Sequence, residues 1–105
     1  MANKLEGPLF DVGLTYGVYA KLDPKRIKHV YRDKQIPDPE GLLDKVMRPE
    51  TMEISYHGKL LSVLSREGYD SADQNVAIGP VLDEKGQRVP GKMRFVHYMP
   101  KRSFE

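Results

Sequence analysis

The chain has 105 residues, a formal net charge of +2 and no cysteine, which fits one small domain and excludes a disulfide framework or a thiolate metal site. No apolar run approaches the roughly 20 residues that span a bilayer, and the first residues lack the basic and apolar stretches of a signal peptide. We therefore expect a cytoplasmic protein without membrane contact, built as a single domain over residues 1–105 with loosely ordered termini at about 1–8 and 100–105.

The first predicted element is a strand over residues 14–22. Tyr16, Val18 and Tyr19 favour a pleated surface. Gly13 and Gly17 weaken this strand or mark a bulge.

Two short helices are predicted next, and each begins with an Asp-Pro pair. Aspartate can accept hydrogen bonds from the free amides of a first helical turn, and proline fits the first helical position. After Asp23-Pro24, residues 27, 30, 31 and 34 follow at helical spacing. After Asp38-Pro39, Leu42, Leu43 and Val46 form a second apolar stripe that ends before Pro49.

The middle of the chain is more ambiguous. Residues 52–56 alternate between apolar and polar types and predict a strand, and His57-Gly58 suits a two-residue turn. Residues 59–67 suit either a returning strand or a two-turn helix that ends at Gly68. Because Ser62 and Ser65 are indifferent helix formers, we favour the strand.

The C-terminal third predicts a hairpin. Residues 76–82 form an apolar strand whose Gly79-Pro80 pair suggests an edge or a bulge, and residues 83–87 form a turn around Gly86. The chain returns through residues 88–89, breaks at Pro90-Gly91 and continues as a strand over residues 92–99. In the last strand, residues 93, 95, 97 and 99 face one side, and residues 94, 96 and 98 face the other. The sum is an α+β fold: a small curved antiparallel sheet of four to five strands, with two short helices after the first strand.

Sequence motifs for metal, nucleotide or cofactor binding are absent, so we expect no cofactor and no metal site. The three histidines lie in separate elements without a paired spacing. Metal-independent cleavage of RNA needs only a general acid, a general base and a cation near the phosphate. His57 and His97 are the candidates for that chemistry, although we consider an enzyme less well supported than a binding protein.

The strongest functional signal is positive charge interleaved with aromatic rings. Single-stranded nucleic acids are held by cations on phosphates and by rings that stack on bases. We expect Arg94 and Tyr98 to share one exposed side and to form the centre of such a surface. The full set of predicted contacts is Lys92, Arg94, Tyr98, Lys101 and Arg102 on the last strand and tail, with Lys25, Arg26, Lys28 and Arg32 on the first helix.

The leading hypothesis is therefore a small non-catalytic accessory or regulatory protein that binds nucleic acid through a basic C-terminal strand and a basic helix. The alternative is a protein-interaction module or inhibitor, a class that includes virus- and plasmid-encoded accessory proteins, because hairpin edges and separated charge also suit a protein partner or a homodimer. The second alternative is a metal-independent ribonuclease.

Overall fold

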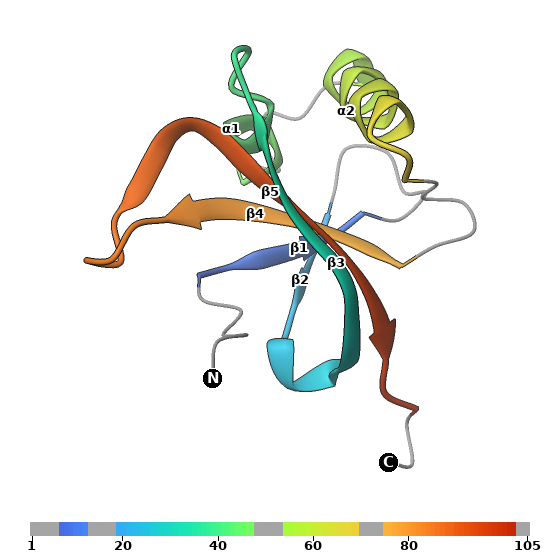
Figure 1. The fold of residues 1–105 in the computed structure, drawn as a ribbon. Helices are drawn as coiled ribbons and strands as arrows, with labels where there is room; N and C mark the ends of the chain where they lie inside the picture. The colour runs from blue at the N-terminus through green and yellow to red at the C-terminus, as the bar shows by residue number, and fades with distance from the viewer. Residues whose placement is uncertain (1–6, 13–18, 48–53, 70–74, 103–105) are drawn as a thin grey trace.

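The computed structural model describes residues 7–12, 19–47, 54–69 and 75–102. It confirms the α+β class, with one antiparallel sheet of five strands and two α-helices (Figure 1). The strands lie in the order β2-β1-β4-β5-β3, so β2 and β3 form the two edges. In chain order the elements are β1 Leu9–Asp11, β2 Ala20–Leu22, the 3-10 turn η1 Pro24–Arg26, β3 Ile27–Pro37, α1 Leu42–Val46, α2 Ile54–Arg66, β4 Val76–Leu82 and β5 Arg88–Pro100.

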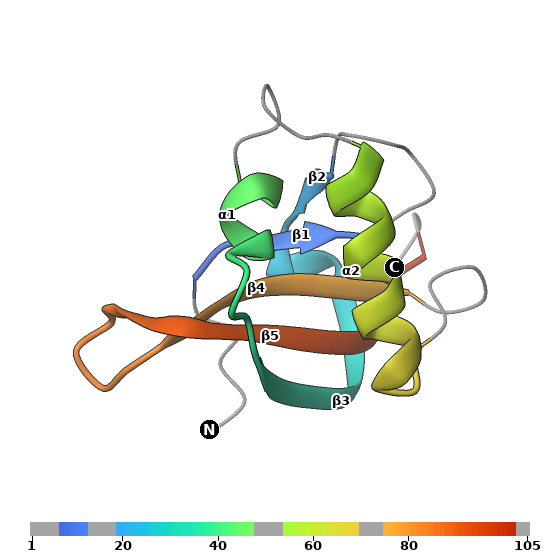
Figure 2. The same ribbon diagram turned by 90° about the horizontal axis from the view of Figure 1, so that it is seen from above.

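Both faces of the sheet are covered, but by different structures. The helices α1 and α2 lie side by side over one face, as Figure 2 shows. Phe95, Leu60 and Leu43 belong to the main core beneath them. On the other face, Leu22, Ile27 and other residues of the β2–η1–β3 connection pack against a smaller cluster from β1, β4 and β5. Because β4 lies between these two clusters, nearly its whole length is buried.

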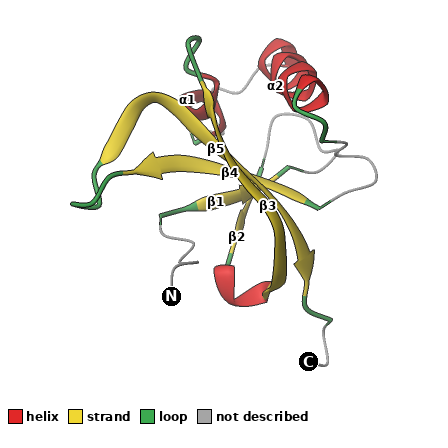
Figure 3. Cartoon of the chain, viewed as in Figure 1, coloured by secondary structure: helices red, strands yellow, loops and turns green. Residues whose placement is uncertain are grey.

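The helix predicted over residues 23–34 was wrong. Asp23 does accept a hydrogen bond from the Lys25 amide at 2.9 Å, but the turn that follows has three residues (Figure 3). From Ile27 the chain becomes β3, which pairs antiparallel with β5 from Ile27 opposite Pro100 to Pro37 opposite Lys92. The β-branched and aromatic residues of this segment suit a strand, and the cross-strand hydrogen bonds outweigh its weak helical periodicity.

The strand and turn predicted within residues 52–58, and the strand favoured over 59–67, were also wrong, because residues 54–66 form α2. Residues 52 and 53 lie outside the described residues. His57, Leu60 and Leu64 are all buried along one side of this helix, which is the spacing of an amphipathic helix. The helix ends as the alternative predicted, at Gly68, where φ is +85° and the amide of Tyr69 donates to the Leu64 carbonyl at 2.9 Å.

The remaining elements agree more closely with expectation. Asp38 begins α1 by accepting hydrogen bonds from the amides of Leu42 and Leu43 at 2.8 and 3.1 Å. The turn over residues 83–87 is present, with Gly86 at φ +79°. Of the strand predicted over 14–22, residues 20–22 form β2, while residues 13–18 lie outside the described part of the chain. Both α-helices follow β3, the third strand of the chain.

Gly79 occupies the middle of β4 because another backbone passes close to it. A Cβ atom there would lie 2.5 Å from the Pro8 carbonyl oxygen, so a side chain would force β1 and β4 apart. The register against β5 is regular at Gly79 and Pro80 and shifts between Pro80 and Leu82, where two steps along β4 match five steps along β5. The extra residues therefore lie in β5 and not in β4, where the bulge was predicted. The predicted edge position was wrong, since β4 has β1 on one side and β5 on the other.

Candidate nucleic-acid interface

The pairing of β3 with β5 joins two basic clusters that are about 70 residues apart in the sequence. Ile27 lies opposite Pro100, and the Lys101 amide donates to the Arg26 carbonyl at 2.8 Å. Residues 20–32 and 97–102 together contain seven lysines and arginines, while Asp23 is their one acid. We call this part of the sheet the basic end, defined by Lys21, Lys25, Arg26, Lys28, Arg32, Lys101 and Arg102.

The basic end is hollowed on the face that lies away from the helices. A cavity of about 410 Å³ is lined by Lys21, Arg26 and Lys101, together with Tyr98. Asp23 also lines it, but one oxygen of its carboxylate already accepts the Lys25 amide. Three cations around one hollow suit a phosphate group better than any neutral ligand.

Three aromatic rings lie in contact at the same end of the sheet: His29, Tyr31 and His97, which we call the ring cluster. The Tyr31 ring centroid is 5.0 Å from that of His29 and 4.8 Å from that of His97. Tyr31 is 48% exposed. Strand alternation places His97 on the same face as Met93 and Phe95, which is the face that carries the helices. The ring cluster and the basic hollow therefore lie on opposite faces of the same strand pair.

Arg32, which follows Tyr31 of the ring cluster, contacts the residues just after α2. Its Nη2 donates to the Gly68 carbonyl at 2.9 Å, and its guanidinium carbon lies 4.1 Å from the Tyr69 ring centroid. Partial burial lowers the pKa of His97, and the charge of Arg32 lowers it further. His97 is therefore neutral at pH 7, and it offers a ring and a hydrogen-bonding group without a positive charge.

The strip expected along β5 is not continuous. Arg94 makes two hydrogen bonds to Asp33, from Nε at 2.8 Å and from Nη2 at 2.6 Å, and its side chain is 13% exposed. Tyr98 is buried, donates to Asp11 at 2.9 Å, and has its pKa raised by burial. Lys92 lies opposite Pro37, at the other end of the β3–β5 pair from Lys101 and Arg102.

His57 lies in the core and not in the interface. It is 2% exposed, and its ring stacks on that of Tyr19 with centroids 5.5 Å apart. Burial raises the pKa of Tyr19 and lowers the pKa of His57, so both groups are neutral near pH 7. A hydrogen bond joins the Tyr19 hydroxyl to Nδ1 of His57, and the tautomer of the neutral imidazole sets which of the two groups donates.

Sequence reasoning named His29 as an exposed residue of the basic helix but did not join it to Tyr31, because on a helix residues two apart do not share a side. On a strand, residues two apart do share a side, and that alternation was the signal available.

In the described ranges, no group of three His, Asp or Glu residues is arranged to hold a metal ion, and no helix is long and apolar enough to cross a membrane. The chain matches no family model, and comparison with curated proteins and with solved structures found no similar protein.

Proposed function

We propose that the protein binds single-stranded nucleic acid at the basic end, in a non-catalytic accessory or regulatory role. The observation that carries this proposal is the pairing of β3 with β5, which brings both basic clusters to the strand pair that also carries the ring cluster with its exposed Tyr31. Cations and rings within one strand pair supply the two interactions that single-stranded ligands require, namely phosphate contacts and base stacking.

The position of these groups favours a single strand over a duplex. The hollow bordered by Arg26 and Lys101 opens on one face, and Tyr31 is exposed on the other, with the edge strand β3 between them. A flexible single strand can pass round that edge, with a phosphate in the hollow and a base on the Tyr31 ring. A duplex is stiff over about 150 base pairs and cannot follow such a path without a large bending cost.

The first test is fluorescence anisotropy with labelled single-stranded RNA and DNA and with a duplex, at low and high salt. We expect single strands to bind more tightly than the duplex. Tyr31→Ala should weaken binding by roughly 5-fold to 150-fold, which corresponds to the loss of one stacked base at about 1–3 kcal/mol. Tyr31→Phe is the matched control, because it keeps the ring, and it should bind like the unchanged protein. Equal binding by all three proteins would refute the stacking role.

The second test concerns the phosphate contacts. Lys101→Gln should reduce the slope of log K against log salt by about 0.7, the value for one phosphate contact on a single strand. Lys85→Gln removes the same charge from the exposed β4–β5 turn, outside the basic end, and should leave the slope unchanged. If both variants change the slope equally, binding depends on net charge and not on this site.

A partner protein on the open edge of β3 is the second candidate function. Eleven residues form this edge strand, and among the residues that the structure describes only β5 pairs with it. An added strand from a partner or from a second copy of the chain would satisfy its outward-facing amides and carbonyls. This candidate predicts a complex that survives nuclease treatment. A ribonuclease that uses His57 together with His97 has less support, because His57 is buried and bonded to Tyr19.

A further inference from the structure

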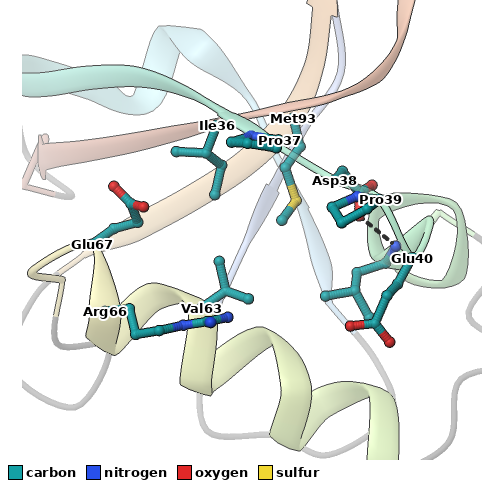
Figure 4. A pocket seen from close by; sticks show the side chains of 10 residues that line it. Ile36, Pro37, Asp38, Pro39, Glu40, Val63, Arg66, Glu67 and Met93 are labelled. Carbon is teal, nitrogen blue, oxygen red and sulfur yellow. Dashed lines mark hydrogen bonds between the residues drawn. The ribbon is translucent and has the colours of Figure 1, made fainter.

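A groove lies between α2 and the end of β3, away from the basic end. Its volume is about 280 Å³. The apolar part of its lining comes from Ile36, Leu42, Val63 and Met93, and Figure 4 shows the Met93 side chain pointing into the space between β3 and α2. This volume lies just below the range of about 300–1,000 Å³ that drug-sized ligands occupy. The groove therefore suits a small molecule and not a folded segment of a partner.

The acidic groups that border this groove already have partners. Glu67 pairs with Lys34 at 2.6 Å, and Glu40 pairs with Lys59 at 2.9 Å. The carboxylate of Asp38 is buried and accepts the two amides at the start of α1. Each acid is thus balanced by a cation or by hydrogen-bond donors, and none of them requires a cationic ligand.

Arg66 is the cation of the groove lining. It belongs to the last turn of α2, and Figure 4 shows its guanidinium extending along the helix beside Val63. Within the described part of the chain, its side chain has no hydrogen-bond or ion-pair partner. A guanidinium presents a fork of donors that matches the two oxygens of a carboxylate. An apolar floor with one such fork at its border is complementary to a molecule with an apolar chain and a carboxylate.

We propose that this groove binds a small organic acid, with its hydrocarbon chain against Val63 and Met93 and its carboxylate on Arg66. A single carboxylate fits better than a phosphate dianion, because Arg66 is the one cation among the residues that line the groove and would balance one negative charge and not two. The site is separate from the basic end, so it does not depend on the function proposed above.

The test is an NMR titration of protein labelled at the methionine methyl groups, with Met93→Leu used to assign the Met93 signal. The probes are hexanoate, hexanol and hexylammonium, which share one chain and differ in charge. Hexanoate should shift the Met93 methyl signal in a saturable way, hexanol should bind more weakly, and hexylammonium should bind weakest. Arg66→Gln should weaken hexanoate binding roughly tenfold and leave hexanol unchanged, since the tenfold loss corresponds to one charge-assisted contact.

Two controls establish that hexanoate binds in the groove and that the variant keeps its fold. Arg26→Gln removes an arginine from the basic end and should leave the hexanoate titration unaltered. The signals of the other methionines report whether Arg66→Gln has kept its fold. The proposal is overturned if hexanoate leaves the Met93 signal unmoved, if hexylammonium binds as tightly as hexanoate, or if Arg66→Gln and Arg26→Gln weaken hexanoate binding equally.

Discussion

Two histidine–tyrosine contacts in this protein use the same side chains in opposite surroundings. His57 and Tyr19 meet inside the core, where each is at most 5% exposed. His97 and Tyr31 meet at the basic end, where Tyr31 is 48% exposed. The first contact forms a hydrogen bond with a neutral imidazole, whereas the second leaves the Tyr31 side chain about half exposed. The residue types alone therefore do not identify a functional site, and the elements that cover each contact decide its role.

The covering elements explain the difference. His57 belongs to the buried side of α2, together with Leu60 and Leu64, so the helix holds it against the sheet. His97 lies on β5 near the point where α2 ends, and Arg32 closes that end by binding the Gly68 carbonyl. Beyond this contact the helix no longer covers β3, and the ring of Tyr31 remains accessible.

The largest expected effect is on stability. His57→Ala should lower the free energy of unfolding by about 3 kcal/mol, because it leaves a cavity and removes the hydrogen-bond partner of the buried Tyr19 hydroxyl. His97→Ala should lower it by less than about 1 kcal/mol, because a partly exposed ring loses few contacts. Urea unfolding followed by circular dichroism measures both. Similar losses in the two variants would mean that burial does not separate the two contacts as described.

A smaller effect is expected from the hydroxyl groups. Tyr19→Phe keeps the ring but removes the hydroxyl that is hydrogen-bonded to Nδ1 of His57, which should cost about 1 kcal/mol of unfolding free energy. Tyr31→Phe removes an exposed hydroxyl and should stay within about 0.5 kcal/mol of the unchanged protein. A loss on Tyr31→Phe as large as that on Tyr19→Phe would show that Tyr31 has a structural role.

How far the sequence predicts the fold is clearest at the two Asp-Pro pairs. Both aspartates accept amides of the turn that follows, as predicted. The segments after the two turns differ in structure. Residues 27–37 pair with β5 along their full length and form a strand, whereas α1 continues as a helix whose apolar side, Leu42, Leu43 and Val46, is buried. Local residues determine the first turn, but a pairing between distant segments determines what comes next, and that pairing has no local signal.

The candidate site shows the same limit. Both basic clusters were evident in the sequence, but only the register of β3 against β5 brings Arg26 beside Lys101. The same register places Asp33 beside Arg94, 61 residues away, and commits that arginine to an ion pair. The alternation of residues 93–98 was predicted, yet alternation alone could not show that the face of Tyr98 is covered by the β2–η1–β3 connection.

The smallest expected effect is on the pH dependence of stability, because protonation changes a ring's charge but leaves the ring in place. Burial lowers the pKa of His57 in the folded protein, whereas the unfolded chain keeps its usual value of about 6.5. The unfolded state therefore takes up protons first, and the free energy of unfolding should fall as pH drops below about 6.5. His97 contributes in the same direction, through burial and Arg32. Urea unfolding between about pH 5 and pH 7.5, above the range where most carboxylates titrate, measures this loss.

His97→Gln separates the two contributions, since it removes the surface histidine and leaves His57 to titrate. This variant should retain the larger part of the loss below about pH 6.5, because the imidazole of His57 is the more deeply buried of the two. If His97→Gln instead abolishes the pH dependence of the unfolding free energy, protonation of His57 in its contact with Tyr19 does not destabilise the folded protein. The distinction between a structural and an accessible histidine–tyrosine contact would then have to rest on the unfolding free energies of the alanine and phenylalanine variants alone.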